Sequence, residues 1–580
     1  MENGYYRNTH PEEQPGRAPA VDLEERVLVG AAMLGAVLGM ARRPVAARET
    51  VALARRLARH PRRAARPAAD LLAEAGRIVA GRSELQPWTS DRRYDDVAWR
   101  SNPLFRVLAQ GHAAVADALD ELLDAAQLEP PDDYRLRIAA TNLAAALAPA
   151  NFPLLNPAAL KAIIDTGGRN LLVGTQRFWK DIRTPPRLPV RSDPGDFELG
   201  RDVAATPGAV VLRTEVMELI QYGPATPEVQ VEPLLMVPSV INKFYLTDLS
   251  PGRSVVEFLV KEGVQTFSIS WINSDKRHRA FGLDTYISAI LEALDAVLSI
   301  TGAERAHTFG NCAGGELLGI AAGHLAATPG QRRIASMTLP VCVMHHAEPG
   351  SPGGLLTREM VRLVTAEAER KGVFAGATLQ GAVAWLRPID SVWWGWVQRY
   401  LLAAEIPKFD LFYWSEDITD VPAALVRDLL ELTLENALAH PGKLTVLGKP
   451  VDMRKVDVDA YLIAGLTDHL THWDSCYRTV TILGSRCEFV LVTGGHLQVV
   501  LRPPGGRAAA FRTAPITLPD PDAWLGQATE QEGSWWLHWL DWLIRRSSGP
   551  TAAPTYLGND EHPVLEPSPG TYVRKRVTTR

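Results

Sequence analysis

The stretch AHTFGNCAGGELLGIAAGHLAA, from Ala306 to Ala327, decides how the rest of the sequence is interpreted. An apolar, strand-like run ends in the pattern Gly310-x-Cys312-x-Gly314, and a helix-like run follows at once. In this context G-x-S-x-G forms a nucleophile elbow, a tight strand-to-helix turn that presents its central side chain at the carboxyl edge of a sheet. The flanking glycines let helix and strand approach each other without a Cβ clash. We therefore predict that Cys312 is a nucleophile.

The helix that follows Cys312 is expected to change the chemistry of its thiol. The N-terminus of a helix favours a negative charge, so the thiol should ionise more readily than that of a free cysteine. The alternative is a small buried cysteine in an ordinary glycine turn. The motif alone does not exclude that alternative, because its meaning depends on the structural context.

An acid and a histidine follow at the ends of two later strand-like runs. Asp468 ends the run AYLIAGLTD, and His496 comes directly after CEFVLVTGG. Both would lie at the same sheet edge as the elbow, and the order nucleophile, acid, histidine is that of α/β-hydrolases. We predict that His496 is the general base for Cys312 and that Asp468 orients or charges this histidine.

Three neighbouring residues compete for these two roles. His469 and His472 are alternative bases, and Asp474 is an alternative acid. The position after the last strand favours His496 over the other two histidines. Asp474 falls within a helix-like segment, which favours Asp468 as the acid.

Acyl transfer also needs N–H donors for an oxyanion. One donor is expected from the backbone of Ala313, directly after the nucleophile. The second is expected from the loop PSVINK over 238–243, which follows the first sheet strand. Since proline lacks an N–H, Ser239 or Val240 is the predicted second donor.

The pattern of the whole chain predicts an α/β fold. From about residue 207, short β-branched runs alternate with amphipathic helical stretches, which indicates a mainly parallel sheet covered on both faces. We expect a disordered N-terminus over 1–20, a mostly helical N-terminal domain over 21–206, an α/β-hydrolase core over 207–348 and 450–580, and a tryptophan-rich helical cap over 349–449. Such an insertion between two strands would lie over the strand ends and form a pocket there.

Composition excludes several other classes of protein. The 580 residues are 46% hydrophobic and carry 61 basic against 66 acidic side chains, which gives no electrostatic footprint for nucleic acid. The four cysteines lack C-x-x-C spacing, which predicts neither disulfides nor a zinc site and favours a reducing cytoplasm. We expect no metal and no diffusible cofactor, because no cluster of side chains has ligand spacing.

One apolar segment, VLVGAAMLGAVLGMA over 27–41, needs separate treatment. Its 15 residues are fewer than the roughly 20 that a membrane-spanning helix needs. It also lacks the basic region and the position of a signal peptide. We expect a buried or partner-docking helix rather than a transmembrane segment, and an anchor to an apolar surface is the alternative.

The motif around Cys312 resembles the lipase-box-like motif of poly(3-hydroxyalkanoate) synthases, in which cysteine replaces the lipase serine. The resemblance runs from about residue 83 to 573 through SELQPWTSDRRYDDVAWRSNPLF, NPAALKAIIDTGGRNL, PLLMVPSVINKFYLTDLSPGRS, LRPIDSVWWGWVQRYLL, GLTDHLTHWDSCYRT and SWWLHWLDWL. ELIQYGPAT and GSWWLHW are most similar to the class II enzymes, which favour medium-chain monomers. Ile389, Gly495 and Arg502 depart from the family pattern near the cap and pocket, so the chain-length preference stays open.

This resemblance implies an acyltransferase that polymerises (R)-3-hydroxyacyl-CoA into a polyester with release of CoA, through an acyl-cysteine at Cys312. It also implies a homodimer and a location at the surface of cytoplasmic polyester granules. Two alternatives remain open. One is a cysteine-nucleophile α/β-hydrolase, such as a thioesterase, a depolymerase or another acyltransferase. The other is a non-catalytic granule-binding protein with a vestigial elbow.

Overall fold

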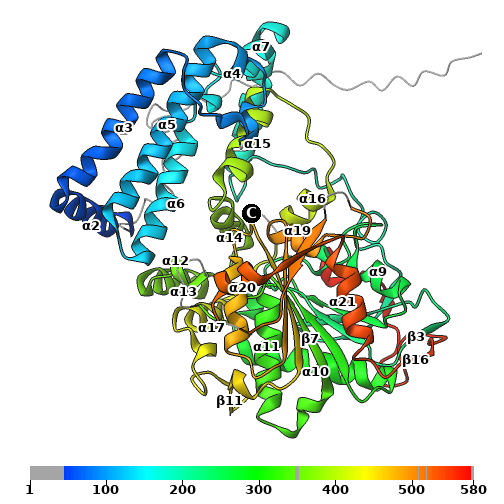
Figure 1. Cartoon of the computed structure of the whole chain (residues 1–580). Helices are drawn as coiled ribbons and strands as arrows, with labels where there is room; N and C mark the ends of the chain where they lie inside the picture. The colour runs from blue at the N-terminus through cyan, green and yellow to red at the C-terminus, as the bar shows by residue number, and fades with distance from the viewer. Residues whose placement is uncertain (1–44, 90, 347–351, 507–508, 518, 577–580) are drawn as a thin grey trace, which may run out of the picture.

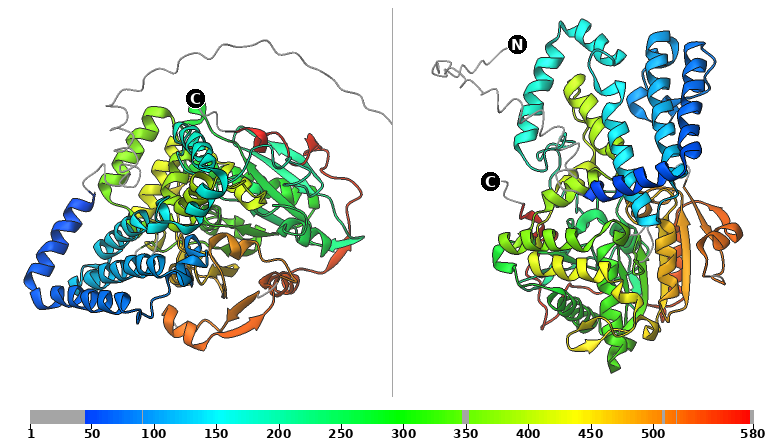
Figure 2. Two further views of the ribbon diagram at one scale, coloured as in Figure 1. Left: turned by 90° about the horizontal axis from the view of Figure 1, so that it is seen from above. Right: turned by 90° about the vertical axis from the view of Figure 1, so that its left-hand side faces the viewer.

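The computed structural model describes residues 45–89, 91–346, 352–506, 509–517 and 519–576. A large twisted sheet with helices on both faces forms the lower body of the molecule in Figure 1, and long N-terminal helices stand above it. Figure 2 shows the same two-part arrangement from the side. The segment 27–41 and the predicted disordered stretch 1–20 lie outside the described residues.

In the described part of the chain, the main sheet has eleven strands in the order β15-β14-β13-β12-β7-β6-β4-β5-β2-β1-β17. Its six central strands are parallel. They are β5 (Thr266–Trp271), β4 (Leu234–Val237), β6 (Ala306–Gly310), β7 (Ile334–Pro340), β12 (Asp459–Gly465) and β13 (Cys487–Val492). Both edges are antiparallel, with β2 (Met217–Tyr222), β1 (Gly208–Arg213) and β17 (Glu566–Pro567) on one side, and β14 (Ala510–Thr513) and β15 (Thr529–Glu532) on the other.

The central strands are buried on both faces, as parallel strands between two helical layers must be. Successive side chains of a strand point to opposite faces. In β12, Leu462 belongs to the hydrophobic core on one face, whereas Tyr461 and Ile463 belong to the core on the other. The near-continuous apolar runs of the sequence follow from this double burial.

Different helices cover the two faces of the sheet. The first core includes α10 (Leu283–Thr301), α11 (Ala313–Ala326) and α17 (Ala423–Leu434). The second includes α9 (Val255–Lys261) and α21 (Trp535–Ile544), which buries four tryptophans, Trp535, Trp536, Trp539 and Trp542. The predicted α/β architecture is confirmed.

A long insertion joins β7 to β12. Its helical elements are α12 (Pro352–Leu355), α13 (Arg358–Lys371), α14 (Gly376–Ala384), η7 (Ile389–Trp393), α15 (Trp394–Trp396), η8 (Val397–Leu401), α16 (Asp410–Glu416), α17, η9 (Ala437–Ala439) and η10 (Met453–Lys455). Trp393, Trp396 and Tyr400 form an edge-to-face aromatic cluster with Phe178 of the N-terminal region. In contrast, α17 packs on α10 of the main body, where the Asp428 carboxylate accepts the Leu283 N–H at 2.8 Å. The cap boundaries at 349 and 449 stay predictions.

The N-terminal region is helical, as predicted. It contains α2 (Val45–Arg59), α3 (Pro61–Val79), α4 (Ala98–Ser101), α5 (Pro103–Ala126), α6 (Pro130–Leu147), α7 (Pro157–Thr166) and α8 (Arg169–Arg183). Four of these helices begin with proline, which suits the first helical position because its missing N–H has no partner there. The Asn170 carboxamide donates to the Leu401 carbonyl at 2.7 Å, so this region is tied to the insertion.

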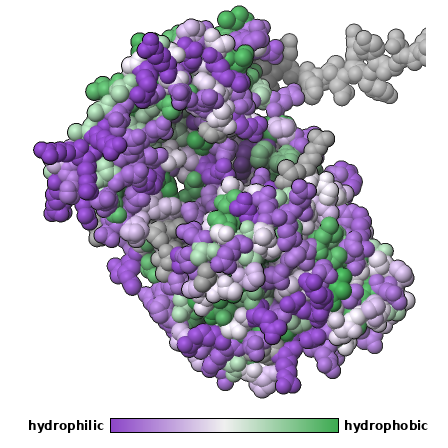
Figure 3. All heavy atoms as spheres, viewed as in Figure 1, coloured by the Kyte–Doolittle hydropathy of each residue, from purple (hydrophilic) through white to green (hydrophobic). Residues whose placement is uncertain are grey.

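Many large apolar side chains of the N-terminal region are exposed, and Figure 3 shows apolar residues among polar ones on this part of the surface. They include Leu72, Val79, Leu104, Leu147, Leu154, Ile164 and Leu172. None of the described helices is both long and apolar enough to span a bilayer.

Candidate active site

Cys312 occupies a strained turn between β6 and α11. Its φ of 52° and ψ of −126° lie in a region that residues other than glycine rarely adopt. The Cys312 N–H donates to the carbonyl of Pro340 at the end of β7, at 3.0 Å. This backbone is the nucleophile elbow that the sequence predicts.

The glycines around Cys312 allow a very close approach of backbone segments. A Cβ on Gly310 would lie 2.8 Å from the carbonyl oxygen of Gly314. A Cβ on Gly314 would lie 2.3 Å from the carbonyl oxygen of Val237, which ends β4. The motif glycines therefore let the elbow, its helix and the end of the neighbouring strand meet.

The structure brings Cys312, His496 and Asp468 together at the carboxyl edge of the sheet. The Cys312 side chain lies close enough to His496 to interact with it and favour its protonated form. The Nδ1 atom of His496 lies 2.7 Å from Oδ2 of Asp468, and both side chains are buried. The three predicted residues thus form one continuous chain of contacts, which is the arrangement that a nucleophile, a base and an orienting acid need.

Asp468 is held by its own loop. Its Oδ1 accepts the backbone N–H groups of Leu470 at 2.8 Å and Thr471 at 3.1 Å, and its Oδ2 accepts the Thr471 hydroxyl at 2.8 Å. Burial opposes ionisation, but His496 and these N–H donors outweigh it and lower the pKa of Asp468. The carboxylate is therefore charged and faces the imidazole.

The pKa of His496 is shifted in the opposite direction. Burial of the imidazole disfavours its charged form, but the Asp468 carboxylate and the Cys312 side chain outweigh burial and raise the pKa of His496 to about 10. A histidine with this preference for the proton can take it from a thiol and keep it. The imidazole of His496 is therefore suited to act as a base toward the Cys312 side chain.

A close glycine contact sets the position of His496 relative to Asp468. His496 begins the short helix α19 (His496–Val500), directly after the turn that follows β13. A Cβ on Gly465, at the end of β12, would lie 2.6 Å from the carbonyl oxygen of Gly494. Since a side chain on Gly465 would clash there, glycine lets the end of β12 and the turn after β13 approach closely, which brings Asp468 and His496 together.

The competing residues lie in other environments. His469 is half-buried, and burial together with the nearby Arg387 lowers its pKa to about 4. His472 precedes α18 (Trp473–Arg478), and its ring packs edge-to-face on Tyr134. Asp474 lies in the first turn of α18, as the sequence suggested, and accepts the Ser475 N–H. The structure therefore places His496, rather than the other two histidines, beside Cys312, and Asp468, rather than Asp474, beside His496.

The predicted oxyanion donors flank the elbow. Ala313 begins α11, and the loop that contains Ser239 and Val240 lies against Gly314, whose Cβ would be 2.6 Å from the carbonyl carbon of Pro238. Within the described residues, no hydrogen bond to a protein acceptor uses the backbone N–H of Ala313, Ser239 or Val240. Their part in binding an oxyanion stays a prediction.

Sequence reasoning missed Thr471. Besides its hydrogen bond to Asp468, its hydroxyl lies 3.2 Å from Nδ1 of His496. Thr471 therefore contacts both members of the acid–histidine pair. The spacing in GLTDHLT, with a threonine three residues after the aspartate, was the available signal, but only the loop geometry shows its use.

The sequence also gave no sign of a second buried acid–histidine pair. Glu316, one turn beyond Cys312 on α11, lies 2.8 Å from Nε2 of His346, and both residues are buried.

Two further thiols, Cys342 and Cys476, are fully buried, and burial raises the pKa of each well above its usual value. Neither of these thiols therefore competes with Cys312 as a nucleophile.

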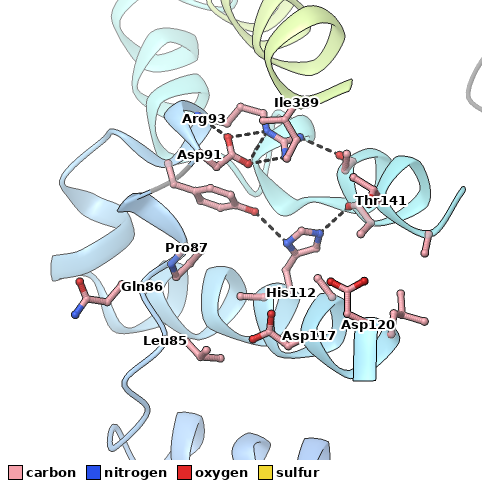
Figure 4. Close-up of a pocket in the computed structure, with 17 residues that line it drawn as sticks. Leu85, Gln86, Pro87, Asp91, Arg93, His112, Asp117, Asp120, Thr141 and Ile389 are labelled. Atoms are coloured by element: carbon pink, nitrogen blue, oxygen red, sulfur yellow. Dashed lines mark hydrogen bonds and ion pairs between the residues drawn. The ribbon is translucent and has the colours of Figure 1, made fainter. Parts of the chain in front are cut away.

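A separate pocket of about 350 Å³ lies among the N-terminal helices. Figure 4 shows His112 of α5 between Tyr94 and the carbonyl of Ala144, with the Asp91–Arg93 ion pair above it in this view. The predicted catalytic side chains do not line this pocket.

In the parts of the chain that the structure describes, no group of three or more His, Cys, Asp or Glu side chains is arranged to hold a metal ion.

The α/β-hydrolase class is defined by a strained nucleophile elbow after a central parallel strand, with an acid and a histidine after later strands. This chain has the elbow after β6, Asp468 after β12 and His496 after β13. In this chain cysteine stands at the nucleophile position. Residues 90–259 match the family model described as the N-terminus of poly-beta-hydroxybutyrate polymerase (PhaC).

Whole-chain comparison assigns the family. The chain is 39% identical to poly(3-hydroxyalkanoate) polymerase 1 of Ectopseudomonas oleovorans, over 94% of this chain and 97% of that protein. It is 35% identical to the poly(3-hydroxyalkanoate) polymerase subunit PhaC of Cupriavidus necator, over 86% of each chain. The chain belongs to the family of poly(3-hydroxyalkanoate) polymerases, and the resemblance seen in the sequence is confirmed.

Among solved structures, the chain is similar to a monoacylglycerol lipase of Paleococcus ferrophilus. The two share 14% sequence identity, with a TM-score of 0.33, over 58% of this chain and 100% of that chain.

Proposed function

We propose that this protein polymerises (R)-3-hydroxyacyl-CoA into poly(3-hydroxyalkanoate) and releases CoA, with Cys312 as the acyl carrier. The observation that carries the proposal is the chain of contacts from Cys312 through His496 to Asp468 at a strained elbow, in a member of the polymerase family. A thiol suits this reaction because thioester exchange forms an acyl-cysteine of similar energy. The acyl group therefore remains transferable.

Acylation is the first step. The Cys312 sulfur attacks the thioester carbonyl, and its proton is held by His496. The tetrahedral intermediate then expels the CoA thiolate, which takes the proton from His496 and leaves as CoA. The N–H of Ala313 and that of Ser239 or Val240 stabilise the negative charge on the carbonyl oxygen. Asp468 stabilises the imidazolium throughout.

Elongation is the second step. The 3-hydroxyl of another hydroxyacyl unit attacks the acyl-cysteine, a base takes the hydroxyl proton, and the Cys312 thiolate leaves as the new ester forms. Either His496 serves as the base in both steps, or Asp468 assists in the second. Neither step needs a metal or a diffusible cofactor, because the thioester is already activated and the N–H donors polarise the carbonyl.

The polyester product is hydrophobic, and this suggests where the protein works. Exposed apolar side chains of the N-terminal region, among them Leu154, Ile164 and Leu172, suit contact with a granule surface or with a second subunit. We propose a cytoplasmic homodimer at the granule surface as the active form. Sedimentation of a fully active enzyme as a monomer would contradict the dimer.

The deciding experiment supplies purified protein with (R)-3-hydroxyacyl-CoA of several chain lengths and measures free CoA together with recovered polymer. Release of CoA with stoichiometric polymer supports the proposal. Release of CoA with only monomeric hydroxy acid would instead identify a thiol hydrolase. No release of CoA with any acyl chain would point to a non-catalytic protein.

A further inference from the structure

The loop 238–243 is fastened to the rest of the protein at several points, although it contains no helix or strand. We call it the oxyanion loop, because it contains the proposed donors Ser239 and Val240. At its start, the indole N–H of Trp271 donates to the carbonyl of Pro238 at 2.8 Å. Further hydrogen bonds to this loop come from two segments that are distant in sequence.

The first of these segments is 414–420, in the insertion between β7 and β12. The buried Thr419 hydroxyl lies within hydrogen-bond distance of the carbonyls of Val240, at 3.2 Å, and Ile241, at 2.7 Å. The indole N–H of Trp414 donates to the carbonyl of Lys243 at 2.8 Å. This segment therefore holds the backbone carbonyls of Val240, Ile241 and Lys243 in the oxyanion loop.

The second segment is the C-terminal tail, residues 571–576. The Lys243 ammonium donates to the carbonyl of Lys575 at 2.7 Å and contacts that of Tyr572 at 3.4 Å. Asn273 reinforces the junction, since its carboxamide donates to the same Lys575 carbonyl at 2.9 Å and accepts the Asp420 N–H at 3.0 Å. The tail and the loop thus meet at the Lys575 carbonyl, and Asn273 connects this junction to the insertion.

Lys243 is an unusual residue for this position. Only 4% of it is exposed, and no ion pair joins it to a carboxylate among the residues that the structure describes. Burial lowers the pKa of Lys243 to about 8, partly offset by the nearby Asp417. Burying an ammonium that is bonded to neutral carbonyls costs free energy. An apolar side chain would fill the same volume at lower cost, so the hydrogen bonds to the tail are the specific contribution of lysine.

We infer that Lys243 is a positioning residue that ties the oxyanion loop to the C-terminal tail, and that the tail thereby holds the second oxyanion donor against the elbow. This inference rests on the proposed function for the identity of the donor. An oxyanion donor acts mainly in the transition state, so loss of its position lowers kcat more than it raises KM. Lys243 itself need not touch the substrate.

The test compares Lys243→Met with Lys243→Arg, using the full-length protein. Methionine fills a similar volume but cannot donate, and we expect kcat for CoA release to fall at least about ten-fold with KM changed less than about two-fold. Arginine can still donate to the carbonyls and should retain more activity than methionine. Lys261→Met, an exposed residue of α9, is the matched control and should behave as the wild type.

A double-mutant cycle with Asn273→Ala separates positioning from general destabilisation. Both side chains act on the Lys575 carbonyl, so the double variant should lose less activity than the product of the two single losses. Asn273→Ala alone should also lower kcat, which keeps the inference testable if Lys243→Met does not fold. Wild-type kcat in both single variants, or a loss confined to KM, would overturn the inference.

A second assay makes this test independent of polymer formation. It measures the p-nitrophenol that is released when p-nitrophenyl butyrate acylates the enzyme. An oxyanion forms in this reaction too, so the variants should show the same order of rates. A wild type that releases p-nitrophenol without making polymer would refute the proposed function and leave the comparison of variants valid. Equal p-nitrophenol rates in wild type and Lys243→Met would refute the role of Lys243.

Discussion

The Oδ2 atom of Asp468 lies 2.7 Å from Nδ1 of His496, and the Thr471 hydroxyl contacts both side chains. This junction joins the ends of two adjacent parallel strands, β12 and β13. It leaves the other imidazole nitrogen of His496 for the Cys312 thiol. The expected effects of changing these residues follow from this geometry.

Replacement of Cys312 tests the acyl carrier directly. Cys312→Ala should lower CoA release by at least about a thousand-fold, because no other group in the site can form the thioester. Cys312→Ser should also be severely impaired, since a serine ester is a poorer acyl donor than a thioester. Steady-state CoA release measures both variants. Wild-type turnover in Cys312→Ala would place the thiol outside the chemistry, and wild-type turnover in Cys312→Ser would refute the thioester argument.

Removal of the Thr471 hydroxyl should loosen the acid–histidine pair without changing the volume of the side chain. We expect Thr471→Val to lower kcat about ten-fold, whereas Thr471→Ser, which keeps the hydroxyl, should stay within about two-fold of wild type. CoA release at saturating substrate measures this effect. If valine and serine behave alike, the hydroxyl does not position the pair.

The raised pKa of His496 predicts how stability depends on pH. An unfolded histidine titrates near 6.5, and the folded one at about 10. Below about pH 6.5 this stabilisation is fully present, and it is lost as the pH rises through the folded value, because the folded state then gives up its extra proton. We expect the Tm advantage of wild type over His496→Gln to shrink between pH 6.5 and 10. A constant difference in Tm over this range would contradict the assigned shift.

Gly314 offers a test of the contact between elbow and oxyanion loop. Gly314→Ala places a Cβ 2.3 Å from the Val237 carbonyl oxygen and 2.6 Å from the Pro238 backbone, so the loop must move. We expect a loss of most CoA release and a destabilisation of about 1–3 kcal/mol. Gly111→Ala in α5 is the control, because no atom lies within 4 Å of its added Cβ. It should raise stability by up to about 1 kcal/mol and leave activity unchanged.

Thermal unfolding and CoA release, measured on the same samples, separate the two glycine variants. Full activity in Gly314→Ala would mean that the loop tolerates displacement from the elbow. A stability loss in Gly111→Ala as large as that in Gly314→Ala would show that the steric argument is wrong.

The sequence by itself determined the α/β class, the elbow at Cys312 and the two strand ends that present Asp468 and His496. It could do so because these features are local: a glycine pattern between a strand and a helix, and polar residues directly after apolar strands. The family resemblance also extended over most of the chain, so it did not depend on a single motif.

Only the tertiary structure decided which contacts complete the site. Thr471 joins Asp468 to His496 because a loop turns back on itself, and Lys243 meets the carbonyl of Lys575 across 332 positions of sequence. The tail and the oxyanion loop each lack a periodic pattern that predicts a partner. Their pairing follows from the packing of the whole sheet and its helices, which brings distant backbone carbonyls and buried donors to one place.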